Sequence, residues 1–181
     1  MEYTAITCFP PYNDNVRFVL KKEGYNPLII LGLNPSTANE VKSDKTIDKI
    51  RGFIDRWKVN EKKNYDSFIM INLYPLRETD PSKLRAKFKD SDLHNKNLTV
   101  IESLLNEYPE SEVLVSYGDS IDKITWMKEC RDDVLKLLSK FPKLKLFQLG
   151  DLTGSKNPRH PSRLAYSTEL KRFINPFENY N

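Results

Sequence analysis

The stretch PLIILGLNPSTA, residues 27–38, joins an apolar run to a loop rich in Gly, Asn and Pro. Its first part, Pro27 to Leu31, is apolar on successive residues, which is typical of a strand covered on both faces of a sheet. Similar runs of strand length span residues 68–73, 113–117 and 144–149. Each run is closed by Gly, Asn or Pro, so together they predict the strands of one sheet.

Helical patterns lie between these runs. Ser43 or Asp44 can cap a first helix, whose apolar residues recur at steps of three and four: Ile47, Ile50, Ile54 and Trp57. Two further sets repeat the pattern: Leu93, Leu98, Ile101, Leu105 and Tyr108, then Met127, Cys130, Val134, Leu137 or Leu138, and Phe141, before Pro142 ends the helix. Strands that alternate with helices imply right-handed crossovers. We therefore predict an α/β fold, a three-layer sandwich with a mainly parallel four-stranded sheet, to which residues 3–20 can add an edge strand or hairpin.

The composition fits one domain and excludes several function classes. A chain of 181 residues buries enough apolar surface for a single domain over residues 1–181. No stretch approaches the roughly 20 apolar residues of a membrane span, and no secretory signal pattern begins the chain, so we expect a cytoplasmic protein without a membrane partner. Cys8 and Cys130 are far apart and lack metal-binding spacing, so we expect no metal cluster. We also expect no cofactor.

The charge is unevenly distributed. The net charge of +4, from 29 basic and 25 acidic residues, permits binding to a polyanion but is also ordinary for a soluble protein. Residues 152–168 contain no acid but include Lys156, Arg159 and Arg163. This segment is either a phosphate contact or a solvated basic loop.

Candidate site residues follow the predicted strands, because ligands of α/β sheets bind just past the carboxyl ends of the strands. Gly32 lets the backbone approach a ligand closely, and Asn34 follows on a turn that Pro35 stiffens. The Asn34 amide can donate and accept at once, so it can hold a water molecule or the edge of a base. The alternative is that Asn34 or Ser36 only caps a turn.

Polar and aromatic side chains also end the second predicted strand. Burying the Asn72 amide without a partner would cost about 1 to 3 kcal/mol, so we expect it to bond to the backbone or to a ligand. Tyr74 either stacks on a ligand or packs in the core.

The two histidines differ in their surroundings. Pro158 and Pro161 lie on either side of His160 and restrict its backbone, which helps to aim an imidazole, although a purely structural role remains open. His94 lies in a polar helix start, and we expect it to be exposed to solvent.

These motifs, taken in order, resemble those of the uracil-DNA glycosylase superfamily. They are Gly-Leu-Asn-Pro-Ser at residues 32–36, Asn72 at a strand end, Tyr-Gly at residues 117–118 and His-Pro-Ser-x-Leu at residues 160–164. The chain more closely resembles domain of unknown function 1643, over about residues 15–165. That resemblance rests on Asn34 to Ala38, Asp44 to Ile47, Asn72 and Leu73, Asn95, Tyr117 and Gly118, and Gly154 to Pro161.

The glycosylase resemblance implies a uracil-DNA glycosylase-like fold and hydrolysis of the N-glycosidic bond between a damaged or modified base and deoxyribose in DNA. It implies that Asn34 positions the attacking water, Asn72 reads the flipped base and His160 stabilises negative charge on the base carbonyl. It also implies that Ser162 grips a phosphate and that Leu164 fills the gap left in the base stack.

The expected site therefore has three parts. Its catalytic residues are Asn34 and His160, its base-binding residues are Asn72, Tyr74 and Gly32, and its DNA- or phosphate-binding residues are Ser36, Ser162, Arg159, Arg163, Lys156 and Leu164. Two alternatives stay open: an enzyme that acts on a free nucleotide or nucleoside, and a non-catalytic module that binds nucleic acid. The expected partner is accordingly DNA or a nucleotide.

Overall fold

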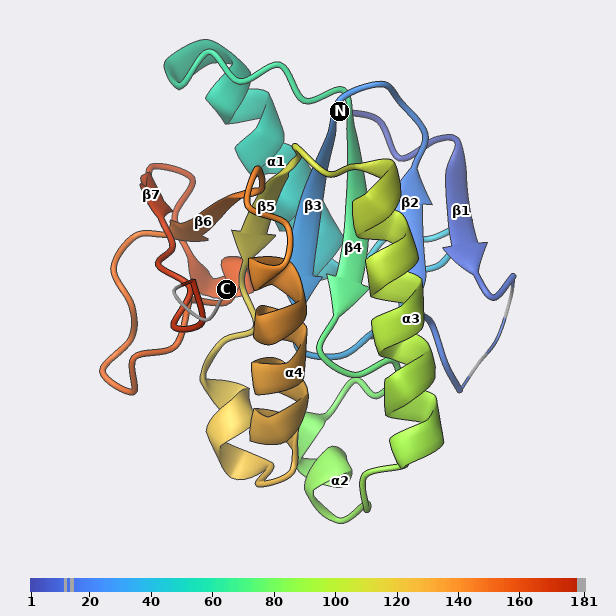
Figure 1. Cartoon of the computed structure of the whole chain (residues 1–181). Helices are drawn as coiled ribbons and strands as arrows, with labels where there is room; N and C mark the ends of the chain where they lie inside the picture. The colour runs from blue at the N-terminus through green and yellow to red at the C-terminus, as the bar shows by residue number, and fades with distance from the viewer. Residues whose placement is uncertain (12, 14, 179–181) are drawn as a thin grey trace.

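The computed structural model describes residues 1–11, 13 and 15–178, and in these residues a single seven-stranded sheet runs through the molecule (Figure 1). The strands are β1 (Ile6–Phe9), β2 (Val19–Lys22), β3 (Pro27–Gly32), β4 (Ser67–Asn72), β5 (Glu112–Val115), β6 (Lys145–Leu149) and β7 (Leu170–Arg172). The helices are α1 (Lys45–Asn60), α2 (Pro81–Arg85), α3 (Ser91–Glu107) and α4 (Met127–Ser139), with short 3₁₀ turns η1 (Asp119–Lys123) and η2 (Pro161–Arg163). The strand order is β1-β2-β4-β3-β5-β6-β7.

The four apolar runs of the sequence form the centre of this sheet. They correspond to β3, β4, β5 and β6, and β3 pairs in parallel with β4 and β5, as β5 does with β6. The prediction of a mainly parallel four-stranded sheet is wrong, because β1, β2 and β7 add three antiparallel pairings at the edges. The edge hairpin expected near residues 3–20 is β1 and β2, whereas β7, with three residues, is too short to leave a periodic signal.

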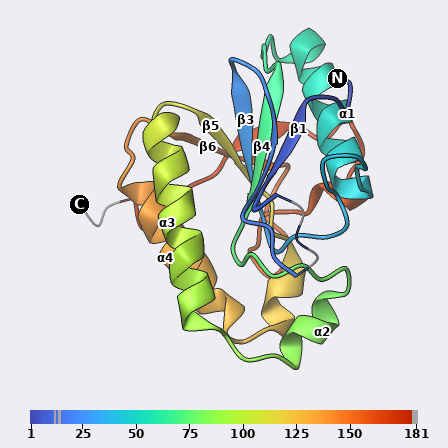
Figure 2. The ribbon, with the colours of Figure 1, turned by 90° about the vertical axis from the view of Figure 1, so that its right-hand side faces the viewer.

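Helices cover both faces of the sheet, as predicted (Figure 2). Alternate residues of a strand point to opposite faces, so Leu28 and Ile30 pack in the core cluster of α1, while Ile29 and Leu31 pack in the cluster of α3 and α4. All four side chains are fully buried, which explains why this strand reads as a continuous apolar run. None of the described helices combines the length and the apolar content that crossing a bilayer requires.

The chain leaves β3 and β5 in opposite directions, although these two strands are neighbours. From β3 the chain passes through α1 to β4, which lies next to β3 on the side away from β5. From β5 it passes through α4 to β6, which lies next to β5 on the side away from β3. Because α1 and α4 also lie on opposite faces, the loops that follow β3 and β5 diverge (Figure 2), and residues of both loops line a crevice at the carboxyl ends of these strands.

Candidate functional site

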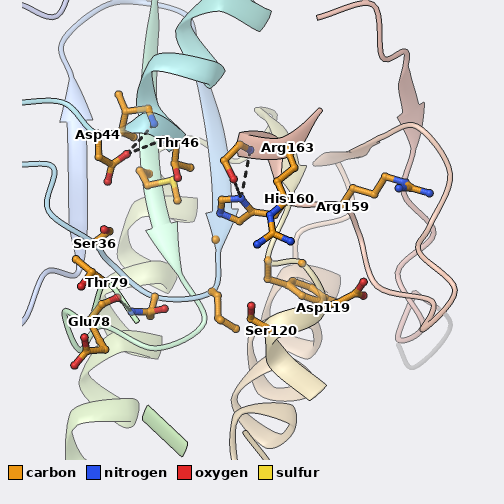
Figure 3. A pocket seen from close by; sticks show the side chains of 18 of the residues that line it. Ser36, Asp44, Thr46, Glu78, Thr79, Asp119, Ser120, Arg159, His160 and Arg163 are labelled. Atoms are coloured by element: carbon orange, nitrogen blue, oxygen red, sulfur yellow. Dashed lines mark hydrogen bonds between the residues drawn. The ribbon is translucent and has the colours of Figure 1, made fainter. Parts of the chain in front are cut away.

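A cavity of about 600 Å³ lies at this crevice, which is a volume typical of sites for small molecules. Its lining comes from the loops after β3, β4, β5 and β6, the start of α1, η1 and the segment before β2, and Figure 3 shows side chains from several of these segments around it. The lining includes most of the residues selected from the sequence: Gly32, Asn34, Ser36, Arg159, His160, Ser162, Arg163 and Leu164. Asn72, Tyr74 and Lys156 are not part of it.

The loop after β6 is held against β5 through Gly118. This residue has a φ of 72°, and a Cβ placed on it would lie only 2.8 Å from the Cβ of His160. Its backbone N–H donates to the carbonyl of Pro158 at 3.0 Å. Asn157 adds side-chain bonds from Nδ2 to Asp122 at 2.7 Å and to Asp119 at 3.1 Å. Glycine is therefore needed at position 118 both for its backbone angle and for the close approach of His160.

The imidazole of His160 is oriented by its own loop. Its Nδ1 accepts the backbone N–H of Ser162 at 3.3 Å and lies 2.8 Å from the Ser162 Oγ. A backbone N–H can only donate, so Nδ1 is the acceptor and the proton of the neutral ring is on Nε2. Nε2 forms no hydrogen bond with the described residues, which leaves it as a donor for a ligand in the cavity.

Burial lowers the pKa of His160, which favours the neutral ring. The charge of Arg163 acts in the same direction, and the carboxylate of Asp44 opposes it. A neutral imidazole with an unoccupied N–H suits stabilisation of an oxygen on which negative charge develops.

Asn34 is fixed through its amide nitrogen. Nδ2 donates to the carbonyl of Glu78 at 2.8 Å and to that of Pro35 at 3.0 Å, with a longer contact to Leu76 at 3.4 Å. The expectation that this amide donates and accepts at once toward a ligand is therefore wrong, because the backbone uses the donor. Oδ1 remains available as an acceptor and can orient a water molecule.

Asn72 is fully buried. Its Oδ1 lies 2.8 Å from the point where a Cβ on Gly32 would be, and the Met70 methyl group occupies the same space. Among the described residues, neither Oδ1 nor Nδ2 of Asn72 has a hydrogen-bond partner. The expectation that this amide bonds to the backbone is therefore wrong, and Asn72 is not in the cavity lining, to which its neighbours Gly32 and Met70 belong.

Tyr74 lies on the face of the sheet that α3 and α4 cover. Its hydroxyl accepts the backbone N–H of Asp90 at 3.0 Å, and its ring meets that of Trp126 edge-on at 4.8 Å. The ring thus packs in the core of α3 and α4 and does not reach the cavity. His94 packs there as well, 1% exposed and 3.1 Å from Asp133, so the expectation that it is exposed is wrong because α4 covers the start of α3.

The predicted phosphate contacts divide into cavity and surface groups. Arg159 and Arg163 are exposed and line the cavity (Figure 3), and the Arg159 Nε donates to the carbonyl of Asp151 at 2.8 Å. Lys156 is exposed outside the lining. Leu164 packs against the core cluster of α1, so it does not project as an intercalating wedge.

The structure adds charged residues that the sequence did not assign to the site. Asp44, Glu78, Asp119, Lys123 and Arg17 also line the cavity. Asp44 caps α1, where its Oδ1 accepts the backbone N–H groups of Thr46 at 2.9 Å and Ile47 at 3.0 Å. The sequence identified Asp44 as a possible cap and as part of a family motif, but its position in the cavity depends on the packing of η2 beside α1. Asp44 carries a carboxylate, which can accept a proton, whereas the amide of Asn34 does not accept one near neutral pH.

A metal centre finds no support in the described residues, where no group of three or more His, Cys, Asp or Glu side chains is arranged to hold an ion. Both cysteines are buried free thiols.

Comparison with known proteins gives one match. No curated protein and no solved structure is significantly similar to this chain. The resemblance to the uracil-DNA glycosylase superfamily is not supported by these comparisons, so that fold and that activity remain proposals. The sequence model of a family described as "Protein of unknown function (DUF1643)" matches residues 17–162, which include β2 to β6 and every residue of the cavity except Arg163 and Leu164. The chain therefore belongs to the DUF1643 family.

Proposed function

We propose that the cavity binds a nucleobase and that the protein hydrolyses the N-glycosidic bond between a damaged or modified base and deoxyribose in DNA. The observation that carries the proposal is the presence of His160, Asn34 and Asp44 in the lining of one cavity. They supply a free N–H donor, an oriented oxygen acceptor and a carboxylate. The order of the motifs along the chain, which resembles that of the uracil-DNA glycosylases, supports the same reaction.

The reaction needs each of these three groups. A water molecule held by Asn34 Oδ1 attacks the sugar carbon, and the bond from this carbon to the base nitrogen breaks with its electron pair going to the base. The proton that the water loses passes to the carboxylate of Asp44. The negative charge on the base spreads to its carbonyl oxygen, where the Nε2–H of His160 stabilises it until the base takes up a proton.

The test uses oligonucleotides that carry uracil, hypoxanthine, mismatched thymine or phage-type modified bases, followed by alkaline cleavage of abasic sites. We expect strand breaks on at least one substrate. His160→Ala should lower the rate about 100-fold or more, as removal of one oxyanion donor does. Ser155→Ala is the matched control, because Ser155 is exposed on the same loop and does not line the cavity.

Two outcomes count against hydrolysis of DNA. One is the absence of strand breaks on every substrate, and the other is a His160→Ala variant that is as active as wild type.

A second candidate is an enzyme that hydrolyses the same bond in a free nucleoside or nucleotide. It is favoured by the packing of Leu164 and by Asp44, Glu78 and Asp119, whose carboxylates line the cavity among its basic groups. Salt separates the two substrates: binding to DNA through several phosphates weakens steeply as salt rises, whereas binding of a nucleotide should show a shallow slope.

A further inference from the structure

Arg17 lines the cavity although only 2% of its surface is exposed. It precedes β2, and its Nη1 donates to the carbonyl of Ala38 at 2.6 Å. Its Nε has no hydrogen-bond partner, and no carboxylate forms an ion pair with it, within the part of the chain that the structure describes. A guanidinium has five N–H donors, and a buried charge without an opposite charge is strongly unfavourable.

A second arginine increases this excess of positive charge. Arg77 donates from Nη1 to the carbonyls of Ser36 at 2.9 Å and Ala38 at 3.2 Å, so two guanidinium groups share the Ala38 carbonyl. Burial and the charge of Arg77 lower the pKa of Arg17 to about 10, which still leaves it charged at neutral pH. Asp44 favours this charge from a distance, but its oxygens bond to backbone N–H groups.

We infer that Arg17 forms an anion-binding subsite inside the cavity, which takes a phosphate or carboxylate group carried by the substrate. Such a group would supply the missing acceptor for the guanidinium and offset the repulsion between the two arginines. Arg77 does not line this cavity; it lines an adjacent hollow with Asn13 and Thr37. Contact with the ligand is therefore assigned to Arg17 alone.

The burial of Arg17 limits the source of the anion. Arg159 and Arg163 are exposed, so the phosphates of a continuous DNA strand could reach them, whereas Arg17 is enclosed. Its anion must belong to the molecule inside the cavity. On the proposed function, on which this step rests, that group is an acidic substituent on a modified base; on the second candidate it is the 5′-phosphate of a free nucleotide. A cavity of about 600 Å³ has room for either in addition to the base.

Calorimetry on the wild-type protein tests the subsite with pairs of ligands that differ in charge. The pairs are uridine with uridine 5′-monophosphate, adenosine with adenosine 5′-monophosphate, and uracil with 5-carboxyuracil. We expect the anionic member of at least one pair to bind about tenfold tighter or more, as a charge-assisted hydrogen bond provides. Tighter binding of a nucleoside monophosphate than of its nucleoside shows that the subsite takes a phosphate. Tighter binding of 5-carboxyuracil than of uracil shows that it takes an acidic substituent on the base.

Variants then assign the preference to Arg17. Arg17→Met should abolish it, while Arg17→Lys should retain most of it. Arg77→Met is the matched control, because it also loses a bond to Ala38 but leaves the cavity lining unchanged, so the preference should persist. If Arg17→Met does not fold, the wild-type pairs and Arg17→Lys still decide.

The inference is overturned if no anionic ligand binds wild type at millimolar concentration, if the pairs bind equally, or if folded Arg17→Met keeps the preference. Binding and hydrolysis fail separately. If anionic ligands bind tighter but no strand breaks or base release occur, the proposed reaction is wrong and the anion-binding subsite stands. If base release occurs without tighter binding of anionic ligands, the subsite is wrong and the proposed reaction stands.

Discussion

At the scale of single residues, the two central side chains of the cavity are fixed by backbone groups of nearby loops. The Asn34 Nδ2 bonds to carbonyls of the loop after β4, and Nδ1 of His160 accepts from the backbone two residues further on. These bonds use one polar atom of each side chain. The other atom, Oδ1 of Asn34 and Nε2 of His160, is left for a ligand. The side chains therefore need little reorganisation when a substrate binds, which is the condition for effective electrostatic stabilisation.

This division of atoms predicts the effect of an aspartate at position 34. Asn34→Asp replaces the donor Nδ2 by an oxygen that faces the carbonyls of Pro35 and Glu78. We expect the free energy of unfolding to fall by about 1 to 3 kcal/mol, measured by urea denaturation.

Asn39→Asp is the control for this substitution. The Asn39 Oδ1 accepts the backbone N–H groups of Val41 and Lys42, and an aspartate keeps both bonds, so stability should change little. Equal stability of Asn34→Asp and wild type would show that Nδ2 does not fix this side chain.

At the scale of elements, the start of α1 combines a structural and a chemical role in one residue. Asp44 caps the helix through Oδ1 and also lines the cavity. Asparagine caps helices about as well as aspartate but does not accept a proton near neutral pH.

Asp44→Asn therefore separates the two roles. Asp44→Asn keeps the cap but loses the charge and the second acceptor oxygen, so its free energy of unfolding should fall by less than that of Asp44→Ala, which also loses about 0.5 to 2 kcal/mol with the cap. On the proposed reaction, base release should fall about 100-fold or more in both variants. Full activity in Asp44→Asn would remove Asp44 as the proton acceptor.

The contact between the end of β5 and the loop after β6 gives a second prediction at this scale. Gly118→Ala introduces a Cβ 2.8 Å from the Cβ of His160, on a backbone with a φ of 72°. We expect a loss of about 1 to 3 kcal/mol in the free energy of unfolding and a displaced His160, measured by denaturation and by the shift of its ring resonances in NMR.

Gly154→Ala is the comparison for this loop, since a Cβ there meets no atom within 4 Å and should leave both measurements near wild type. A Gly118→Ala variant with wild-type stability and unshifted His160 resonances would contradict the proposed close approach.

At the scale of the whole molecule, the order of the strands creates the site. The outgoing connections of β3 and β5 diverge, and the loop after β6 returns across the gap to pack η2 beside α1. Asn34 and His160, far apart in the sequence, thereby line the same cavity. Arg17 enters it from the segment before β2, a strand that pairs antiparallel with β1 and β4 and lies outside the parallel core.

Local patterns in the sequence were sufficient to predict the central strands, the three long helices and the loops that carry Asn34 and His160. Strand length, helical periodicity and turn residues are local properties, so they can be recognised without knowledge of the partners. The short β7 left no such pattern, and α2 was also missed.

Which side chains share the cavity depended on packing between segments that are distant in sequence. Tyr74 and Asn72 follow one another closely, yet Tyr74 lies on the face covered by α3 and α4, while Asn72 is buried beside Gly32. Arg17 and Asp44 give no local signal of a site, because an isolated arginine and a helix cap look the same wherever they face. Side-chain direction and burial follow from sheet order and from the crossing of helices, and these are set by contacts throughout the core.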